Sequence, residues 1–123
     1  EFRRVLFRSG VVAAARPGVG CRAVYEAAVA AAERLGLGAR FMGHGPEQVR
    51  FIDHGVGLEL DELPVLTTSD AALEEGMVFA LEPKFVLPGV GAVGVENTFV
   101  VERDGLRALT RAPEELRELP LDG

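Results

Sequence analysis

Three residues of this chain have side chains and surroundings suited to metal chemistry. His54 lies in the run DHGVGLELDE, Glu82 in GMVFALEP and Glu96 in GVENT, so each is framed by glycine or proline. One imidazole and two carboxylates on separate strands are donors that divalent ions accept. The three positions therefore predict part of a metal hydrolase site, provided that the fold brings them together.

Taken one at a time, these residues also have ordinary structural explanations. A single histidine in a glycine-rich turn more often forms hydrogen bonds at the surface than binds a metal. A glutamate before proline is often only a charge at the end of a strand. The metal hypothesis therefore depends on the three motifs occurring together.

Hydrophobic periodicity indicates the elements that carry these residues. Apolar positions recur every three or four residues over 21–35, which predicts an amphipathic helix that ends at Gly36. A short alanine-rich helix is expected over 10–16, closed by Pro17 and Gly18. The other expected elements are strands over 49–52, 56–60, 77–81, 95–102 and 106–109, a hairpin over 86–93, extended chain over 63–68 and a helical turn opening at 112–116.

Length and charge narrow the class of protein. The chain has 123 residues, enough for one domain with a buried core, and a formal net charge of -6. This charge argues against nucleic-acid binding, which depends on clustered lysine and arginine. No run approaches the roughly 18 apolar residues that span a bilayer, so no membrane role is expected.

Cysteine usage bears on the compartment. Cys21 is the only cysteine, which excludes an intrachain disulfide and makes the reducing cytoplasm the expected location. Its place at the start of the expected helix could lower the pKa of its thiol and make it reactive. A small, buried, apolar role is the favoured alternative.

The first nine residues, EFRRVLFRS, have neither the order of a signal peptide nor a helix cap. They combine three arginines with four large apolar residues and resemble the translation of a sequencing-adapter end. We therefore expect 1–9 to be a non-native artefact and 10–123 to be the natural part of the chain.

A family resemblance rests on three motifs taken in order. The runs HGVGLELDE, GMVFALEP and GVENTFVVERDG resemble the C-terminal half of the pita-bread metallopeptidases. This family includes methionine aminopeptidase, Xaa-Pro aminopeptidase and prolidase, with creatinase as a metal-free relative, and the similarity runs from about Val11 to Leu119. It implies an α+β fold, the C-terminal half of a pita-bread (creatinase/aminopeptidase) domain, with a helix packed on a curved, mostly antiparallel sheet.

The resemblance also implies roles for residues. It makes His54, Glu82 and Glu96 metal ligands, with Glu96 bridging two divalent ions (Mn, Co, Fe or Zn) that share and deprotonate a water. Two further ligands of the family are aspartates from the first half of the domain, and this chain lacks them. The site is therefore expected to be incomplete here.

Three positions depart from the family pattern. Asp61 replaces a histidine that contacts substrate, and it is expected to be either a general base or acceptor in catalysis or a solvated acid. Arg50 replaces a second histidine, which many Xaa-Pro enzymes have. Asp53 replaces the glycine before the metal-binding histidine, where it would either crowd the site or reflect a sequence error.

The resemblance favours one function over two alternatives. The chain is expected to be an inactive fragment of a metal-dependent exopeptidase that hydrolyses Xaa-Pro or similar N-terminal peptide bonds. Its expected partners are a peptide substrate, the missing N-terminal half of the same domain and a second copy in a homodimer, but neither nucleic acid nor a membrane. The alternatives are a non-catalytic pita-bread protein that binds peptides or partners, and a metal-free hydrolase of the creatinase type.

Overall fold

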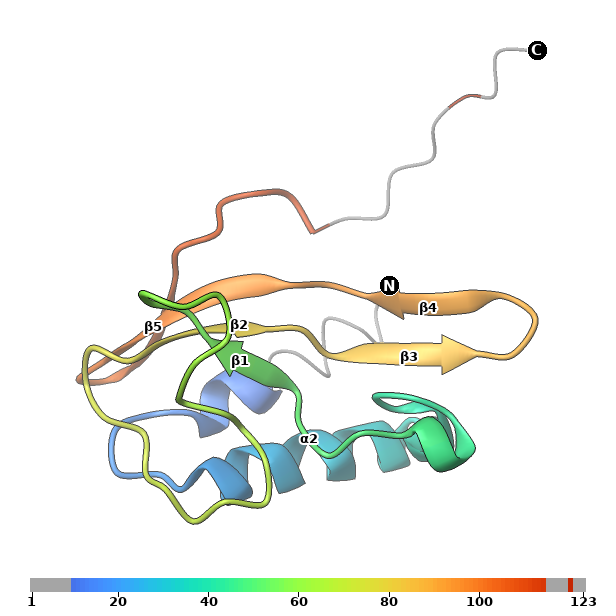
Figure 1. Ribbon diagram of the computed structural model, residues 1–123, viewed down its shortest axis with the longest axis horizontal. Coiled ribbons are helices and arrows are strands. Elements are labelled where there is room, and N and C mark those ends of the chain that lie inside the picture. The colour runs from blue at the N-terminus through green and yellow to red at the C-terminus, as the bar shows by residue number, and fades with distance from the viewer. Residues whose placement is uncertain (1–9, 115–119, 121–123) are drawn as a thin grey trace.

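A helix packs against an antiparallel sheet in this protein (Figure 1). The computed structural model describes residues 10–114 and 120, so the expectation for 1–9 lies outside the described residues. The sheet has the strand order β1-β2-β5-β6, and β3 pairs with β4 in a separate two-stranded sheet. The strands are β1 (Asp53–Gly55), β2 (Val78–Leu81), β3 (Lys84–Leu87), β4 (Gly91–Gly94), β5 (Asn97–Glu102) and β6 (Gly105–Ala108).

The main helix, α2 (Cys21–Arg34), forms where the periodicity predicts it and lies along one face of the sheet (Figure 1). Its inner face is built of small side chains at spacings of three and four, which let helix and sheet approach closely. Gly36 adopts a φ of 72°, a left-handed conformation that ends the helix. The shared core comprises Val24, Ala28, Ala31 and Ala32 of α2 with Ile52, Leu66, Phe79, Leu81, Phe99 and Val101.

A long hairpin runs through β2, β3, β4 and β5 (Figure 1). Leu81 pairs with Asn97 at the end of β2, and Lys84 pairs with Gly94 at the start of β3. Two residues separate these pairs on each arm, so the register continues without an insertion. Glu82 therefore lies across the hairpin from Glu96. The turn expected at Pro88 and Gly89 closes the hairpin, as 86–93 predicted.

Two predicted strands are wrong. Over 49–52 the chain forms only an isolated bridge between Phe51 and Thr67, and β1 begins at Asp53. Over 56–60 it bends outward, and Leu58 is fully exposed. The physical reason is that Gly55 and Glu62 exchange both backbone hydrogen bonds, at 2.8 and 3.2 Å, which closes the intervening residues into a loop.

The helical elements at the two ends differ in outcome. A helical segment covers 10–14, in agreement with the expectation for 10–16. Residues 112–114 are not helical, and the rest of the turn predicted at 112–116 lies outside the described residues. No helix in the described part of the chain is long and apolar enough to cross a membrane.

Candidate metal centre

The strand register places the predicted metal ligands on one face of the sheet. Residues directly across from one another in an antiparallel sheet project to the same side. His54 aligns with Ala80 of β2, which aligns with Thr98 of β5. Because side chains alternate along a strand, Glu82 and Glu96, each two residues further along, share this face. We call this shared side of the sheet the ligand face; it is turned away from α2.

His54 lies between two carboxylates on this face. Its Nε2 is 3.7 Å from Oε1 of Glu96, and its Nδ1 is 3.3 Å from Oδ1 of Asp61 and 3.1 Å from the carbonyl oxygen of Gly55. Burial lowers the pKa of His54, but the Gly55 carbonyl and the charges of Asp61 and Glu82 outweigh it and leave the pKa raised. The imidazole is therefore surrounded by negative charge.

Glu82 is held from two sides. Its backbone N–H donates to the carbonyl of Ile52 at 2.9 Å, which ties the end of β2 to the chain before β1. Its Oε2 is 3.4 Å from Nζ of Lys84, two residues further along the same arm. Lys84 was missed by sequence reasoning, although it is the only lysine and the strand period of two places it beside Glu82.

The three donors fit a divalent ion in kind but converge only in part. One imidazole and two carboxylates suit ions such as Mn²⁺ and Zn²⁺. However, no three His, Cys, Asp or Glu side chains within residues 10–114 are arranged to hold a metal ion. His54 and Glu96 face each other, whereas Glu82 is paired with Lys84. Their roles as metal ligands stay predictions.

Asp61 reaches the site from the exposed loop that follows β1. Its side chain is 75% exposed, and its carboxylate lies beside Nδ1 of His54. This contact shows that the loop brings Asp61 to the ligand face, which strand alternation alone did not predict. The position suits an acceptor for the imidazole, and the general-base role stays a prediction.

Asp53 does not crowd the ligand face, so that expectation is wrong. Its side chain is 1% exposed and lies on the opposite face, where Oδ1 accepts the Leu66 N–H at 2.5 Å and Oδ2 has no hydrogen-bond partner. Burial raises the pKa of Asp53 to about 7.

Burial, with a further contribution from the Asp53 charge, also raises the pKa of the Cys21 thiol. Cys21 is buried, so its apolar role is confirmed and the reactive alternative is wrong.

Arg50 lies away from the ligand face. It lines a shallow pocket of about 280 Å³ together with Tyr25 and Glu33 of α2. Its carbonyl accepts the hydroxyl of Thr67 at 2.5 Å. The structure therefore brings Asp61 to His54 but does not bring Arg50 there.

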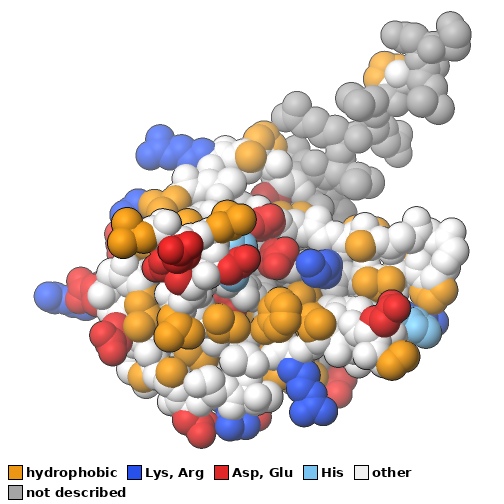
Figure 2. Space-filling view, viewed as in Figure 1, with side chains coloured by type: hydrophobic (Ala, Val, Ile, Leu, Met, Phe, Trp, Pro, Cys, Tyr) orange, Lys and Arg blue, Asp and Glu red, His pale blue; other side chains and the backbone are white. Residues whose placement is uncertain are grey.

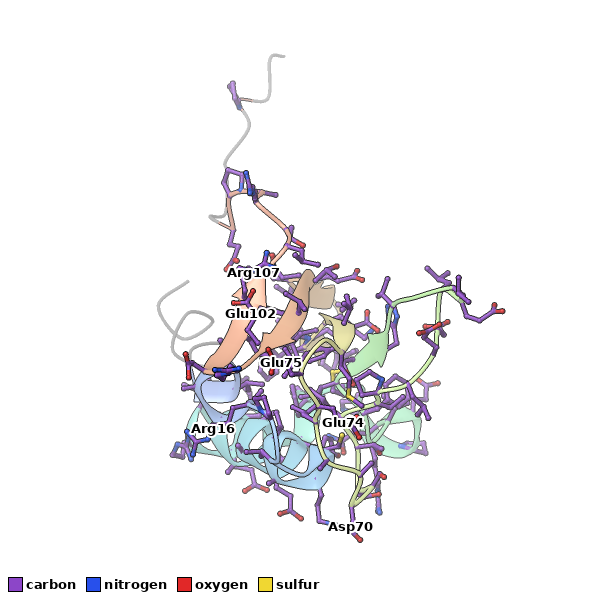
Figure 3. The ribbon with its side chains drawn as sticks, turned by 90° about the vertical axis from the view of Figure 1, so that its left-hand side faces the viewer. Arg16, Asp70, Glu74, Glu75, Glu102 and Arg107 are labelled. Atoms are coloured by element: carbon purple, nitrogen blue, oxygen red, sulfur yellow. The ribbon has the colours of Figure 1, made fainter. Side chains whose placement is uncertain are left out.

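Two cavities differ in whether they border a predicted ligand. One of about 230 Å³ borders Glu96 and is also lined by Thr110 and Pro113. Thr110 is fixed there because its hydroxyl accepts the Thr98 N–H at 2.8 Å. The other, of about 620 Å³, lies at the turn between β5 and β6 (Figure 3) and contains none of the predicted ligands; its lining includes Arg16, Glu75 and Glu102. Of these two cavities, the one of about 230 Å³ is therefore the one that borders a predicted metal ligand.

Gly55 ends β1, the strand that carries His54, and Gly55→Ala is expected to destabilise the protein by about 3 kcal/mol. A Cβ at this position would collide with the backbone of Glu62 and Leu63, which cannot retreat without breaking the paired hydrogen bonds. Urea unfolding measures the change. Gly10→Ala is the matched control, because its Cβ would meet no heavy atom within 4 Å. Equal unfolding midpoints for the two variants would contradict the prediction.

One family pattern and two curated relatives connect this chain with peptidases. The sequence pattern of metallopeptidase family M24 matches residues 8–103, which is more than half of the chain. The Xaa-Pro dipeptidase of Lactobacillus helveticus is 29% identical over 115 residues, covering 93% of this chain and 29% of the relative. The Xaa-Pro dipeptidase of Pyrococcus furiosus is 33% identical over 106 residues, covering 85% and 28%. The chain thus spans less than a third of the length of these relatives.

Solved structures agree with the sequence relationship. The X-Pro aminopeptidase of Thermotoga maritima superposes with a TM-score of 0.82 at 25% identity, covering 93% of this chain and 31% of that one. The prolidase of Pyrococcus furiosus gives 0.80 at 28% identity, covering 92% and 32%. The SPT16 N-terminal domain from Cicer arietinum, at 18% identity and a TM-score of 0.70, shows the fold alone. With part of a pita-bread fold and a matching sequence pattern, this chain belongs to metallopeptidase family M24.

Proposed function

We propose that this chain is the C-terminal part of a metal-dependent exopeptidase that hydrolyses Xaa-Pro or similar N-terminal bonds, and that the part alone is inactive. The observation that carries the proposal is the common face of His54, Glu82 and Glu96, with the two glutamates across from each other in one hairpin. The relatives named as Xaa-Pro dipeptidases support the substrate class. The cavity beside Glu96 offers space for a peptide.

In the complete site, two divalent ions (Mn, Co, Fe or Zn) would supply Lewis acidity and an activated water. His54, Glu82 and Glu96 would hold these ions together with aspartates from outside this chain. Asp61, beside Nδ1 of His54, orients the imidazole so that Nε2 remains directed toward Glu96. The residues of this chain thus supply donors and their orientation.

The exposed apolar surface supports a missing partner. Leu58, Leu60 and Leu63 are at least 78% exposed in the loop beside the site, and Figure 2 shows hydrophobic and acidic side chains together on this side of the molecule. We assign this surface to the N-terminal half of the same domain, with a homodimer as the second arrangement. We place the parent protein in the cytoplasm, since the single buried Cys21 carries no sign of an oxidising compartment.

The test is to recover the upstream reading frame, express the full-length protein and assay Ala-Pro hydrolysis with Mn²⁺ or Co²⁺. We expect hydrolysis that a chelator abolishes and that the 123-residue chain lacks. A full-length protein that binds two ions yet cleaves no dipeptide would contradict the proposal.

A non-catalytic peptide-binding protein is the second candidate. Two observations favour this candidate. Asp61 stands where the family has a histidine that contacts substrate, and the donors within residues 10–114 converge only in part. Peptide binding by the full-length protein that persists unchanged in excess chelator, without hydrolysis, would support this candidate over the first.

A further inference from the structure

Among the ion pairs of residues 10–114, Lys84 is the one lysine or arginine that contacts a predicted ligand carboxylate. Resting on the proposed metal-dependent function, we propose that Lys84 competes with divalent ions for Glu82. In the ion-free chain the Lys84 ammonium forms an ion pair with the Glu82 carboxylate, and a divalent ion must displace the ammonium before it can bind that carboxylate.

Contacts around Glu82 support this assignment. Nζ of Lys84 is 3.4 Å from Oε2 of Glu82, while His54 and Glu96 face each other at 3.7 Å. Two of the three predicted ligands are thus already adjacent. Glu82 instead pairs with Lys84, and the three side chains are not arranged to hold a metal ion within residues 10–114. The pairing of Glu82 with Lys84 accounts for this incomplete convergence.

The residue across from Lys84 leaves it room to move. Lys84 pairs directly with Gly94, and a Cβ at Gly94 would lie 2.9 Å from the Cβ of Lys84. A side chain there would therefore compete with the lysine stem for space. Because residue 94 has none, the flexible four-carbon stem can turn away from Glu82 when an ion arrives.

The charge and exposure of Lys84 and Glu82 determine how much Lys84 weakens the binding of a divalent ion. The side chains of Lys84 and Glu82 are 40% and 27% exposed, so water screens the pair and makes it weak enough to displace. An ammonium beside a bound divalent ion still repels it. Removing the ammonium should therefore tighten ion binding by about fivefold, the order expected for partly screened charges several ångströms apart.

The experiment measures Mn²⁺ affinity of the 123-residue chain from the electron paramagnetic resonance signal of free Mn²⁺. Lys84→Met removes the charge and keeps a long stem, whereas Lys84→Arg keeps the charge. Arg22→Met is the matched control: it makes the same change in net charge, but Arg22 is on α2 and pairs with Asp70 at 2.7 Å. We expect Lys84→Met to bind about fivefold more tightly than the unmodified chain, and the other two variants to change little.

A second measurement does not depend on a variant. Because Lys84 is the only lysine, reductive ¹³C-methylation gives one lysine signal, separate from that of the N-terminal amine. Zn²⁺ should shift this signal at the concentration that saturates the site. An unshifted signal at saturation would overturn the inference.

The outcomes separate this inference from the proposed function. If Lys84→Met binds Mn²⁺ no more tightly than Arg22→Met, the inference is overturned while metal-dependent hydrolysis by the full-length protein can stand. If Lys84→Met binds more tightly but the full-length protein cleaves no dipeptide, the inference holds and the proposed function fails. If none of the chains binds Mn²⁺, the inference is overturned.

Discussion

Glu96→Gln in the full-length protein is expected to lower kcat/KM for an Xaa-Pro dipeptide by about 10³-fold, since a metal centre supplies several kcal/mol of transition-state stabilisation. Glu96 lies between β4 and β5, faces His54 and borders the adjacent cavity. The substitution keeps the shape of the side chain but removes the charge with which it would bridge two ions. Steady-state kinetics and the metal content of the purified protein measure the effect together.

Glu102→Gln is the control for this prediction. Glu102 ends β5, the strand that begins just after Glu96, but its carboxylate pairs with Arg107 on β6, as Figure 3 shows. It tests whether loss of any carboxylate along this arm lowers the measured hydrolysis through impaired folding. We expect activity within a fewfold of the unmodified protein. Activity of Glu96→Gln within tenfold of the unmodified protein, with full metal content, would refute the assigned role.

The fold was most predictable where local chemistry and tertiary packing agree. Helix α2 has small apolar residues at helical spacing and a glycine soon after its end, so its sequence and its packing require the same element. The hairpin through Pro88 and Gly89 is equally local. By contrast, the alternation of Val56, Leu58 and Leu60 matches a strand, but the chain leaves the sheet after Gly55 pairs with Glu62. A long-range pair decides that segment, and periodicity contains no information about it.

The candidate site was predictable in its donors but not in their partners. Motifs identified His54, Glu82 and Glu96, and strand alternation accounts for their common face once the register is known. The contact of Lys84 with Glu82 depends on side-chain torsions and on the missing side chain at Gly94. The face occupied by Asp53 depends on where β1 begins. A prediction of 49–52 as the strand leaves that starting point, and hence the direction of the Asp53 side chain, unspecified.

Asp53→Asn is expected to remove a pH dependence of stability that amounts to about 2–4 kcal/mol. Burial raises the pKa of Asp53 from 3.8 to about 7, so the folded chain keeps its proton after the unfolded chain has lost it. The contribution of Asp53 to stability is complete below pH 3.8 and is lost as the pH rises to about 7. Asparagine does not ionise, and its carbonyl can still accept the Leu66 N–H.

Urea unfolding at several pH values between about 4 and 8 measures this effect. The informative quantity is the slope of the free energy of unfolding against pH. In Asp53→Asn the new amide nitrogen would replace an oxygen that has no hydrogen-bond partner, so a constant offset between the two proteins is expected at every pH. On top of that offset, the stability of Asp53→Asn relative to the unmodified chain should rise toward pH 7 and then level off. Asp104→Asn, at an exposed turn, should leave the curve unchanged. Parallel stability curves for Asp53→Asn and the unmodified chain would contradict the prediction, because they would show that Asp53 has the same pKa in the folded and the unfolded chain.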